Sequence, residues 1–116
     1  MEAKPTIKYD EFAKLDLRVA TIVAAEVHPN ADRLVKLQVD LGSEQRQICA
    51  GIREFVDVDS LVGRQIVVLV NLEPRTIRGE PSNGMLLAAT VQEGEKLQDV
   101  VPLGPAKPVA NGAAVS

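Results

Sequence analysis

Strict alternation of apolar and polar side chains in RLVKLQVDL, residues 33–41, is the sequence feature that most constrains the fold of this chain. Every second residue from Val35 to Leu41 is apolar, and the positions between them carry charged or amide side chains. A period of two places alternate side chains on opposite faces of a strand. The segment is therefore predicted to be a β-strand with one face in a core and the other in solvent.

Four other segments are predicted to be strands, because they are rich in β-branched and aliphatic residues and are bounded by turn-forming residues such as HPNAD, 28–32. No segment has the period of a long helix. Residues 9–16 and 56–63 are each expected to form a short helical turn, the first with Phe12 and Leu15 directed inward. The four further strands are LRVATIVAAEV (17–27), QRQICA (45–50), RQIVVLVNL (64–72) and MLLAATV (85–91).

Five short strands without a long helix favour an all-β fold, a five-stranded oligonucleotide/oligosaccharide-binding (OB) barrel. A small β-sandwich is the competing architecture. The 116 residues fit a single domain, residues 1–116, with the barrel over about 12–92. The segment after Gly94 has little periodicity and three prolines, so the C-terminal extension, about 97–116, is expected to be extended or loose rather than helical.

The net charge of −3 argues against a generic polyanion-binding protein, although it is compatible with a local basic patch. No run approaches the roughly 20 apolar residues of a membrane span. The N-terminal MEAKPTIKYDEF lacks the apolar core of a signal peptide. The single Cys49 cannot form an internal disulfide, and its setting suggests a buried side chain. Together these features predict a reducing, cytoplasmic location.

Candidate catalytic groups are scarce. The single histidine, His28, stands beside a proline in a predicted turn, and Cys49 lies in an apolar run. Zinc needs about four ligands, and no such spacing of Cys and His exists. No phosphate-binding glycine motif is present, and Asp57 and Asp59 fit a solvated acidic loop better than a catalytic pair. We therefore expect no enzyme activity, no metal and no cofactor.

The connection between the fourth and fifth strands, NLEPRTIRGEPSNG at residues 71–84, has the most unusual composition in the chain. Arg75 and Arg78 lie in a segment stiffened by proline and β-branched residues, and arginine presents a planar fork of donors to phosphate oxygens. Ser82 and Asn83 add neutral donors of the kind that contact phosphate and sugar. The loop is predicted to recognise an anion; the alternative is that two arginines merely keep a loop soluble.

Arg33 and Lys36 begin the second strand, where they form either an ordinary solvated face or part of a binding face. In OB barrels, ligands lie on the face of strands two and three, between the loops after strands one and four. Here those loops are 28–32 and 71–84. Strands two and three carry no aromatic residue for base stacking. A nucleic acid bound there would be recognised through its backbone, 2′-hydroxyls and shape.

The order of five motifs resembles the bacterial tRNA-binding domain, which occurs at the C-terminus of methionyl-tRNA synthetase and as a stand-alone, structure-specific tRNA-binding protein. It is also similar to the oligonucleotide-fold part of the cytokine-precursor domain attached to eukaryotic synthetase complexes. The match runs from about Phe12 to Ala89, most of the chain. The motifs are FAKLDLRVATI, HPNADRLVKLQVDLG, RQICAGI, LVGRQIVVLVNLEPRTIRG and SNGMLLAA.

The resemblance implies an OB barrel that binds tRNA by its folded shape, without catalysis and without selecting one anticodon. It also implies a homodimer formed through the C-terminal extension, and a possible aminoacyl-tRNA synthetase partner. Two departures from the family pattern concern the binding loop: Asn83 stands where the family usually has glutamate, and PRTIRG lacks a frequent lysine. The tRNA-facing positions implied by the resemblance are Asn71, Arg75, Arg78, Ser82 and Met85, with Arg33 as a weaker candidate.

Two further functions stay open. An export-associated bacterial chaperone uses the same barrel, so binding of unfolded polypeptide is the main alternative, although that branch generally lacks the H-P-N-A-D and S-x-G-M segments. A small-molecule site in the barrel mouth is a more distant possibility. A methionine directly before the start of the resemblance favours a stand-alone protein over an excised synthetase domain, although a cloning start would look the same.

Overall fold

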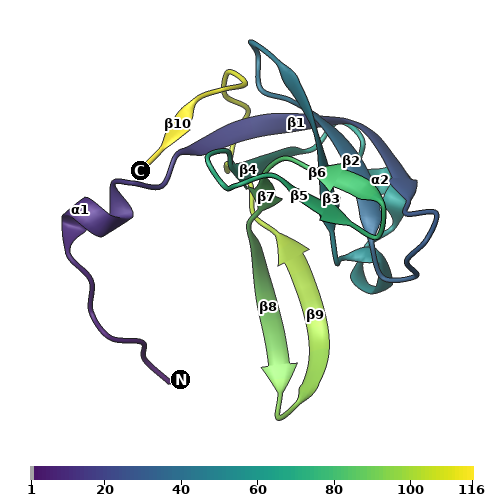
Figure 1. Ribbon diagram of the computed structural model, residues 1–116, viewed down its shortest axis with the longest axis horizontal. Coiled ribbons are helices and arrows are strands. Elements are labelled where there is room, and N and C mark those ends of the chain that lie inside the picture. Colours follow the sequence, from purple (N-terminus) through teal and green to yellow (C-terminus); the bar gives the residue numbers. More distant parts are fainter. Residues whose placement is uncertain (1) are drawn as a thin grey trace.

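The computed structural model describes residues 2–116 and is built around an antiparallel five-stranded barrel (Figure 1). The strands follow the order β3-β2-β1-β4-β7, and the terminal strands β3 and β7 approach each other so that the barrel is nearly closed. The predicted OB-like barrel is therefore confirmed. Its strands are β1 (Leu17–Val27), β2 (Val35–Asp40), β3 (Gln45–Ala50), β4 (Gln65–Leu69) and β7 (Met85–Leu86).

The alternating segment builds the centre of the core. Val35, Leu37 and Val39 of β2 are fully buried, and the residues between them are half-buried, as the alternation predicts. Burial of each such side chain stabilises the fold by roughly 1.5–3 kcal/mol. The other strands contribute the rest of the core, chiefly Ile22, Ile48, Ile66 and Val68.

Strand β1 belongs to both halves of the barrel. Its first part, Leu17–Thr21, pairs with β4, and its later part pairs with β2 as far as Val27. The register with β2 shifts between Ile22 and Ala24. A bulge of this kind bends a strand and increases its twist, which lets β1 curve around the core.

The helical segments are short: α1 (Tyr9–Phe12), the 3-10 turn η1 (Arg53–Phe55) and α2 (Val58–Leu61). The first and last lie within the two predicted helical turns, whereas η1 was not predicted. The side chain of Asp57 accepts a hydrogen bond from the Asp59 backbone N–H and so caps α2, whose Leu61 is fully buried. The prediction for α1 is wrong in one respect. Phe12 and Leu15 are 37% and 46% exposed, because α1 lies away from the barrel in Figure 1 and does not reach the core. No helix of residues 2–116 has the length and apolar character needed to cross a membrane.

Two hairpins follow β4. The first, β5 (Arg75–Ile77) and β6 (Glu80–Ser82), lies within the connection to β7. The second, β8 (Ala88–Glu93) and β9 (Lys96–Pro102), projects from the barrel (Figure 1). The single fifth strand predicted over residues 85–91 is thus wrong, because the run divides at Leu87. Its first part pairs with β4 and its second part with β9, a distinction that an apolar run does not encode.

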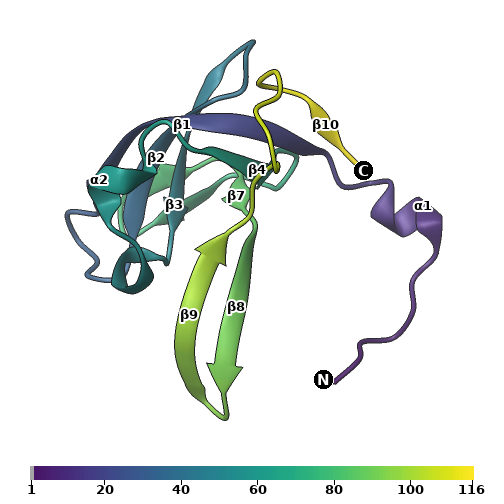
Figure 2. The same ribbon diagram turned by 180° about the vertical axis from the view of Figure 1, so that it is seen from behind.

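Residues 103–116 form a C-terminal strap that crosses the barrel over β4 and β1 and ends in β10 (Ala114–Val115), which pairs with β1 (Figure 2). The Val67 N–H donates to the Leu103 carbonyl, and the Val19 N–H donates to the Ala113 carbonyl. A Cβ at Gly104 would collide with the carbonyl oxygen of Gln65, so the strap is pressed against the β4 backbone. Of the two predicted states, extended or loose, the extension takes the extended one, and hydrogen bonds to β4 and β1 hold it on the barrel.

Candidate functional site

The hairpin of β5 and β6, residues 75–82, is here called the arginine hairpin. Its two-residue turn is Arg78-Gly79, between the paired residues Ile77 and Glu80. Positive φ angles at both turn residues, 52° and 87°, identify a type I′ turn, whose twist matches that of the flanking strands. Among residues 2–116, Arg78 is the only non-glycine residue with positive φ. The hairpin therefore carries an arginine at a position that normally favours asparagine, aspartate or glycine.

Both predicted arginines, Arg75 and Arg78, are exposed on this hairpin. Within residues 2–116 neither guanidinium has a carboxylate partner, whereas Arg18 and Arg46 are ion-paired. Their donors therefore face solvent and are available to an anion. An unpaired guanidinium is suited to a phosphate oxygen pair because its N–H groups form a fixed fork.

Ser82, also predicted as a site residue, lies inside the protein and is 1% exposed. Its hydroxyl accepts a hydrogen bond from the Cys49 N–H (3.0 Å) and is 3.4 Å from the Gly84 carbonyl, to which it can donate. Both hydrogen-bonding functions of the hydroxyl are thus used within the fold. Ser82 attaches β6 to β3 and presents no donor to solvent.

Asn83 and Gln47 continue this attachment. The Asn83 N–H donates to the Gln47 carbonyl (2.8 Å), and Gln47 Nε2 donates to the Pro81 carbonyl (2.9 Å). The backbone of Asn83 is therefore part of the fold, and only its partly exposed side chain remains available to a ligand. Gln47 was not predicted as a site residue, because its role depends on backbone carbonyls.

Lys36 is held by two carboxylates. Its Nζ is 2.8 Å from Glu80 Oε1 and 2.9 Å from Glu26 Oε1, and its side chain is 14% exposed. Hydrogen bonds to Glu80 and Glu26 raise the pKa of Lys36, and the hydrogen bond from Lys36 lowers the pKa of Glu80. The charge of Lys36 is thus neutralised within the fold. The ion pair fastens β6 of the arginine hairpin to β2 and β1.

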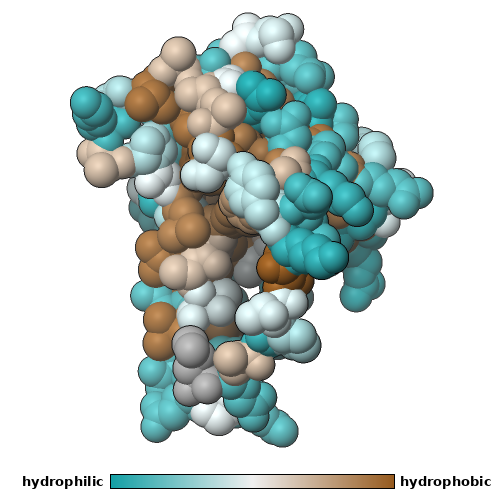
Figure 3. All heavy atoms as spheres, turned by 90° about the vertical axis from the view of Figure 1, so that its left-hand side faces the viewer, coloured by the Kyte–Doolittle hydropathy of each residue, from teal (hydrophilic) through white to brown (hydrophobic). Residues whose placement is uncertain are grey.

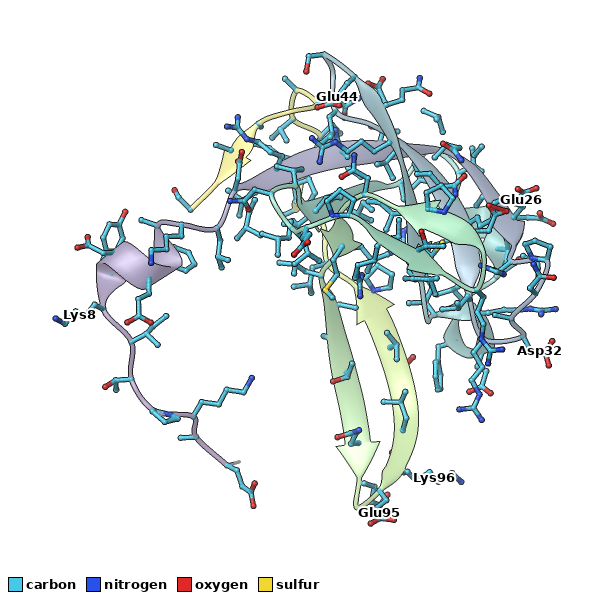
Figure 4. The ribbon with its side chains drawn as sticks, in the orientation of Figure 1. Lys8, Glu26, Asp32, Glu44, Glu95 and Lys96 are labelled. Atoms are coloured by element: carbon cyan, nitrogen blue, oxygen red, sulfur yellow. The ribbon has the colours of Figure 1, made fainter. Side chains whose placement is uncertain are left out.

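His28 is a site residue that the sequence did not reveal. It is 2% exposed; its Nε2 is 2.9 Å from the Ile77 carbonyl, and its Nδ1 accepts the Asn30 N–H (3.0 Å). An accepting Nδ1 requires the proton on Nε2, so the ring donates to Ile77. Asn30 Nδ2 also donates to the Arg78 carbonyl (3.4 Å). The turn after β1, which contains Asp32, therefore contacts the turn of the arginine hairpin (Figure 4).

The remaining predicted residues occupy different settings. Both polar atoms of the Asn71 side chain bond to the backbone. Oδ1 accepts from the Asp16 N–H (2.9 Å), and Nδ2 donates to the Lys14 carbonyl (2.7 Å). These two hydrogen bonds fix the segment before β1. Arg33 is 83% exposed, with Nε 3.7 Å from Glu54 Oε1, and remains open to a ligand.

Met85, 40% exposed, lies beside Arg75 in a groove of about 540 Å³. The groove runs between the barrel and the β8–β9 hairpin, and its lining is largely apolar. A ligand that contacts Arg75 thus meets an apolar surface next to the charge. The other lining residues include Leu34, Ile52, Ile77, Leu87, Leu97 and Val100.

The chemistry available here is recognition of an anion. In the part of the chain that the structure describes, no group of three or more His, Cys, Asp or Glu side chains is placed to hold a metal ion. Asp57 caps α2, and burial raises the pKa of the Cys49 thiol, which disfavours the nucleophilic thiolate. The structure thus places Arg75 and Met85 in the lining of one groove and exposes Arg78 in the turn of the arginine hairpin. Lys36 and Ser82 attach this hairpin to the barrel, and Asn71 fixes the segment before β1.

Comparisons with known proteins match most of this chain to one family. Residues 17–114 match a family model described as a putative tRNA binding domain. Over 104 residues the chain is 51% identical to the methionine–tRNA ligase of Chlorobium luteolum, an alignment that covers 90% of this chain and 15% of the ligase. The chain thus spans a small part of that enzyme's length.

Solved structures share the fold over nearly the whole chain. A MetRS-related protein from Pyrococcus horikoshii superposes with a TM-score of 0.88 at 32% identity, covering 97% of this chain and 100% of the other. The chaperone CsaA from Bacillus anthracis superposes with a TM-score of 0.84 at 32% identity, with the same coverage of both chains.

Proposed function

Since the chain belongs to the putative tRNA-binding domain family, we propose that it binds folded tRNA through the arginine hairpin and catalyses no reaction. One observation carries this proposal: Arg75 and Arg78 are exposed and without carboxylate partners among residues 2–116, on a hairpin fixed to the barrel. Among residues 2–116, Arg18, Arg33, Lys36 and Arg46 are instead paired with carboxylates. Arg75 and Arg78 are positioned for phosphate oxygens.

Recognition rests on backbone and shape. The few aromatic residues, Tyr9, Phe12 and Phe55, all lie outside β2 and β3, so the binding face has no platform for base stacking. Phosphate and sugar contacts position a nucleic acid without reading its bases. The domain is therefore proposed to select tRNA by its folded shape, with little preference among anticodons.

Contacts to tRNA are assigned to the exposed side chains of Arg75, Arg78, Met85 and Asn83, with Arg33 at the edge. Lys36 and Ser82 support the arginine hairpin through the contacts described above, whereas Asn71 fixes the segment before β1. Asn83 stands where the family usually has glutamate, so the loop carries one negative charge fewer, which favours phosphate. Cytoplasmic location is part of the proposal, supported by the free and buried Cys49.

A homodimer is also proposed, through the outer face of the β8–β9 hairpin. Val91, Val101 and Leu103 are 49%, 44% and 44% exposed. Thr90 and Val100 of the opposite face line the groove. Figure 3 shows apolar side chains extending down this flank of the molecule. Covering such a surface with the same surface of a second copy makes a two-fold interface.

The relation to the ligases sets the biological role that we propose. The matched region is 15% of the Chlorobium luteolum enzyme, so most of that enzyme lies outside the match. A module that holds tRNA by its phosphates raises the effective concentration of tRNA at a synthetase, whether the two are joined covalently or associate.

Binding of unfolded polypeptide is the second candidate. The apolar groove beside Met85 and the similarity to the chaperone CsaA favour it. In this function the groove would take apolar side chains, and Arg75 would contribute little. Binding of tRNA thus depends on the arginines, whereas binding of unfolded polypeptide depends on the apolar groove.

A filter-binding comparison of folded tRNA, unstructured RNA of equal length and an unfolded polypeptide separates these functions. The proposal predicts preference for folded tRNA over both competitors. A preference for unfolded polypeptide would support the chaperone function, and equal binding of the two RNAs would contradict recognition by shape.

A further inference from the structure

The two strands of the arginine hairpin are attached to the barrel unequally. Strand β6 is held by the Lys36–Glu80 ion pair, by Gln47 and by the Ser82 hydroxyl. Strand β5, which carries Arg75 and leads into Arg78, is the outer strand and pairs only with β6. The arginines therefore lie on the less supported half of the hairpin.

Within residues 2–116, the hydrogen bonds that join β5 or the hairpin turn to the barrel come from the turn after β1. His28 Nε2 donates to the Ile77 carbonyl at 2.9 Å, and Asn30 Nδ2 donates to the Arg78 carbonyl at 3.4 Å. The bond from His28 is shorter and is made by a ring that is 2% exposed. This bond is part-buried, and breaking it leaves the buried imidazole N–H without its partner, which is costly.

We propose that His28 is a positioning residue for tRNA binding, which holds the β5 backbone at Ile77 so that Arg75 and Arg78 are fixed before tRNA arrives. This inference rests on the proposed function. Ordering a charged loop during binding costs conformational entropy, and fixing the loop beforehand removes that cost. His28 thus acts on affinity through the backbone, without touching the nucleic acid.

Two substitutions separate the two hydrogen bonds of the ring. In His28→Gln the side-chain amide reaches as far as Nε2 and can still donate to the Ile77 carbonyl. In His28→Asn the shorter amide reaches as far as Nδ1 and can still accept the Asn30 N–H, but the bond to Ile77 is lost. If the bond to the hairpin is what matters, glutamine preserves binding and asparagine does not.

The experiment measures tRNA affinity against salt for the wild type, both His28 variants and Arg75→Gln/Arg78→Asn. His28→Asn is expected to bind about tenfold more weakly, the effect of one lost hydrogen bond, at an unchanged salt slope because both arginines remain. His28→Gln is expected to bind within about twofold of the wild type. Arg75→Gln/Arg78→Asn, by contrast, should reduce the magnitude of the salt slope.

Three results would overturn the inference: wild-type affinity in His28→Asn, equal losses in the asparagine and glutamine variants, or a changed slope in His28→Asn. Should His28→Asn not fold, Asn30→Ala removes only the exposed bond to Arg78, and weaker binding at an unchanged slope is again expected. Wild-type affinity in Asn30→Ala would then count against the inference. Failure of the wild type to bind tRNA would instead reject the proposed function.

Discussion

At the scale of single residues, Arg78 occupies a backbone conformation that asparagine or glycine adopts at lower cost. Its φ of 52° lies in the left-handed region. Such a conformation costs a residue with a Cβ on the order of 1 kcal/mol. Arg78 makes no ion pair among residues 2–116 that would offset this cost. The proposed contact of Arg78 with tRNA would account for an arginine at this position.

Arg78→Asn tests this explanation directly. Asn-Gly is a preferred type I′ turn, so the melting temperature should stay the same or rise. Affinity for every tRNA should fall about equally, by roughly 1.5–3 kcal/mol for a lost charged hydrogen bond. Thermal unfolding and filter binding measure the two effects. Lys96→Asn is the matched control. Lys96 lies at the tip of the β8–β9 hairpin, far from the arginine hairpin (Figure 4), so this variant should bind tRNA normally.

Glu80→Gln tests the attachment of β6 to Lys36. The ion pair lowers the pKa of Glu80, so its contribution to stability is present above the ordinary glutamate pKa of about 4.3 and is lost as pH falls through the lowered value. The variant should melt below the wild type at pH 7, and the difference should vanish in acid. Glu95→Gln, at the tip of the β8–β9 hairpin, should melt like the wild type at every pH. A difference for Glu80→Gln that persists in strong acid would contradict the role of the ion pair.

Sequence patterns predict side-chain chemistry better than side-chain position. Arg75 and Arg78 were both predicted, and the structure exposes them. Lys36 and Ser82 have equally suitable chemistry, yet a carboxylate pair and a backbone N–H engage them inside the fold. His28 was missed because its partner is a backbone carbonyl 49 residues away. No pattern of side chains indicates such a contact.

At the scale of elements, the β8–β9 hairpin has two faces in different surroundings. Thr90 and Val100 lie opposite each other and line the groove, whereas Val101 is exposed on the other face. Strands β1 to β4 were predicted from periodicity and composition, because turn-forming or polar segments separate them in the sequence. The division of residues 85–91 between two sheets was not predicted, because β7 and the start of β8 form one continuous apolar run in the sequence.

Val101→Asp tests the proposed dimer. Because Val101 is 44% exposed, the protomer should keep its fold, while a charge placed in a dimer interface should shift sedimentation towards a monomer. Gln98→Asp, on the same strand, is the control and should remain dimeric. A point substitution is preferable to deletion after Leu97, because the strap contributes backbone hydrogen bonds to β1 and β4. A dimer that survives Val101→Asp would move the interface elsewhere.

At the scale of the whole molecule, a net charge of −3 coexists with a local cationic surface. Debye screening makes the near arginines matter more to a bound phosphate than distant acids, over about 8–10 Å at ordinary salt. The barrel was predictable because alternation, turns and length all agree with it. The arrangement of the site was harder to predict from the sequence, because it depends on how the β4–β7 connection folds back over β3.

The most direct test of the central claim is the salt dependence of tRNA affinity in the wild type and in Arg75→Gln/Arg78→Asn. The wild-type affinity should fall with salt on a log–log plot. The double variant should bind more weakly, with a slope smaller in magnitude by roughly 1.4 to 1.8, about 0.7 to 0.9 for each lost phosphate contact. An unchanged slope and affinity in the double variant would contradict tRNA binding by the arginine hairpin.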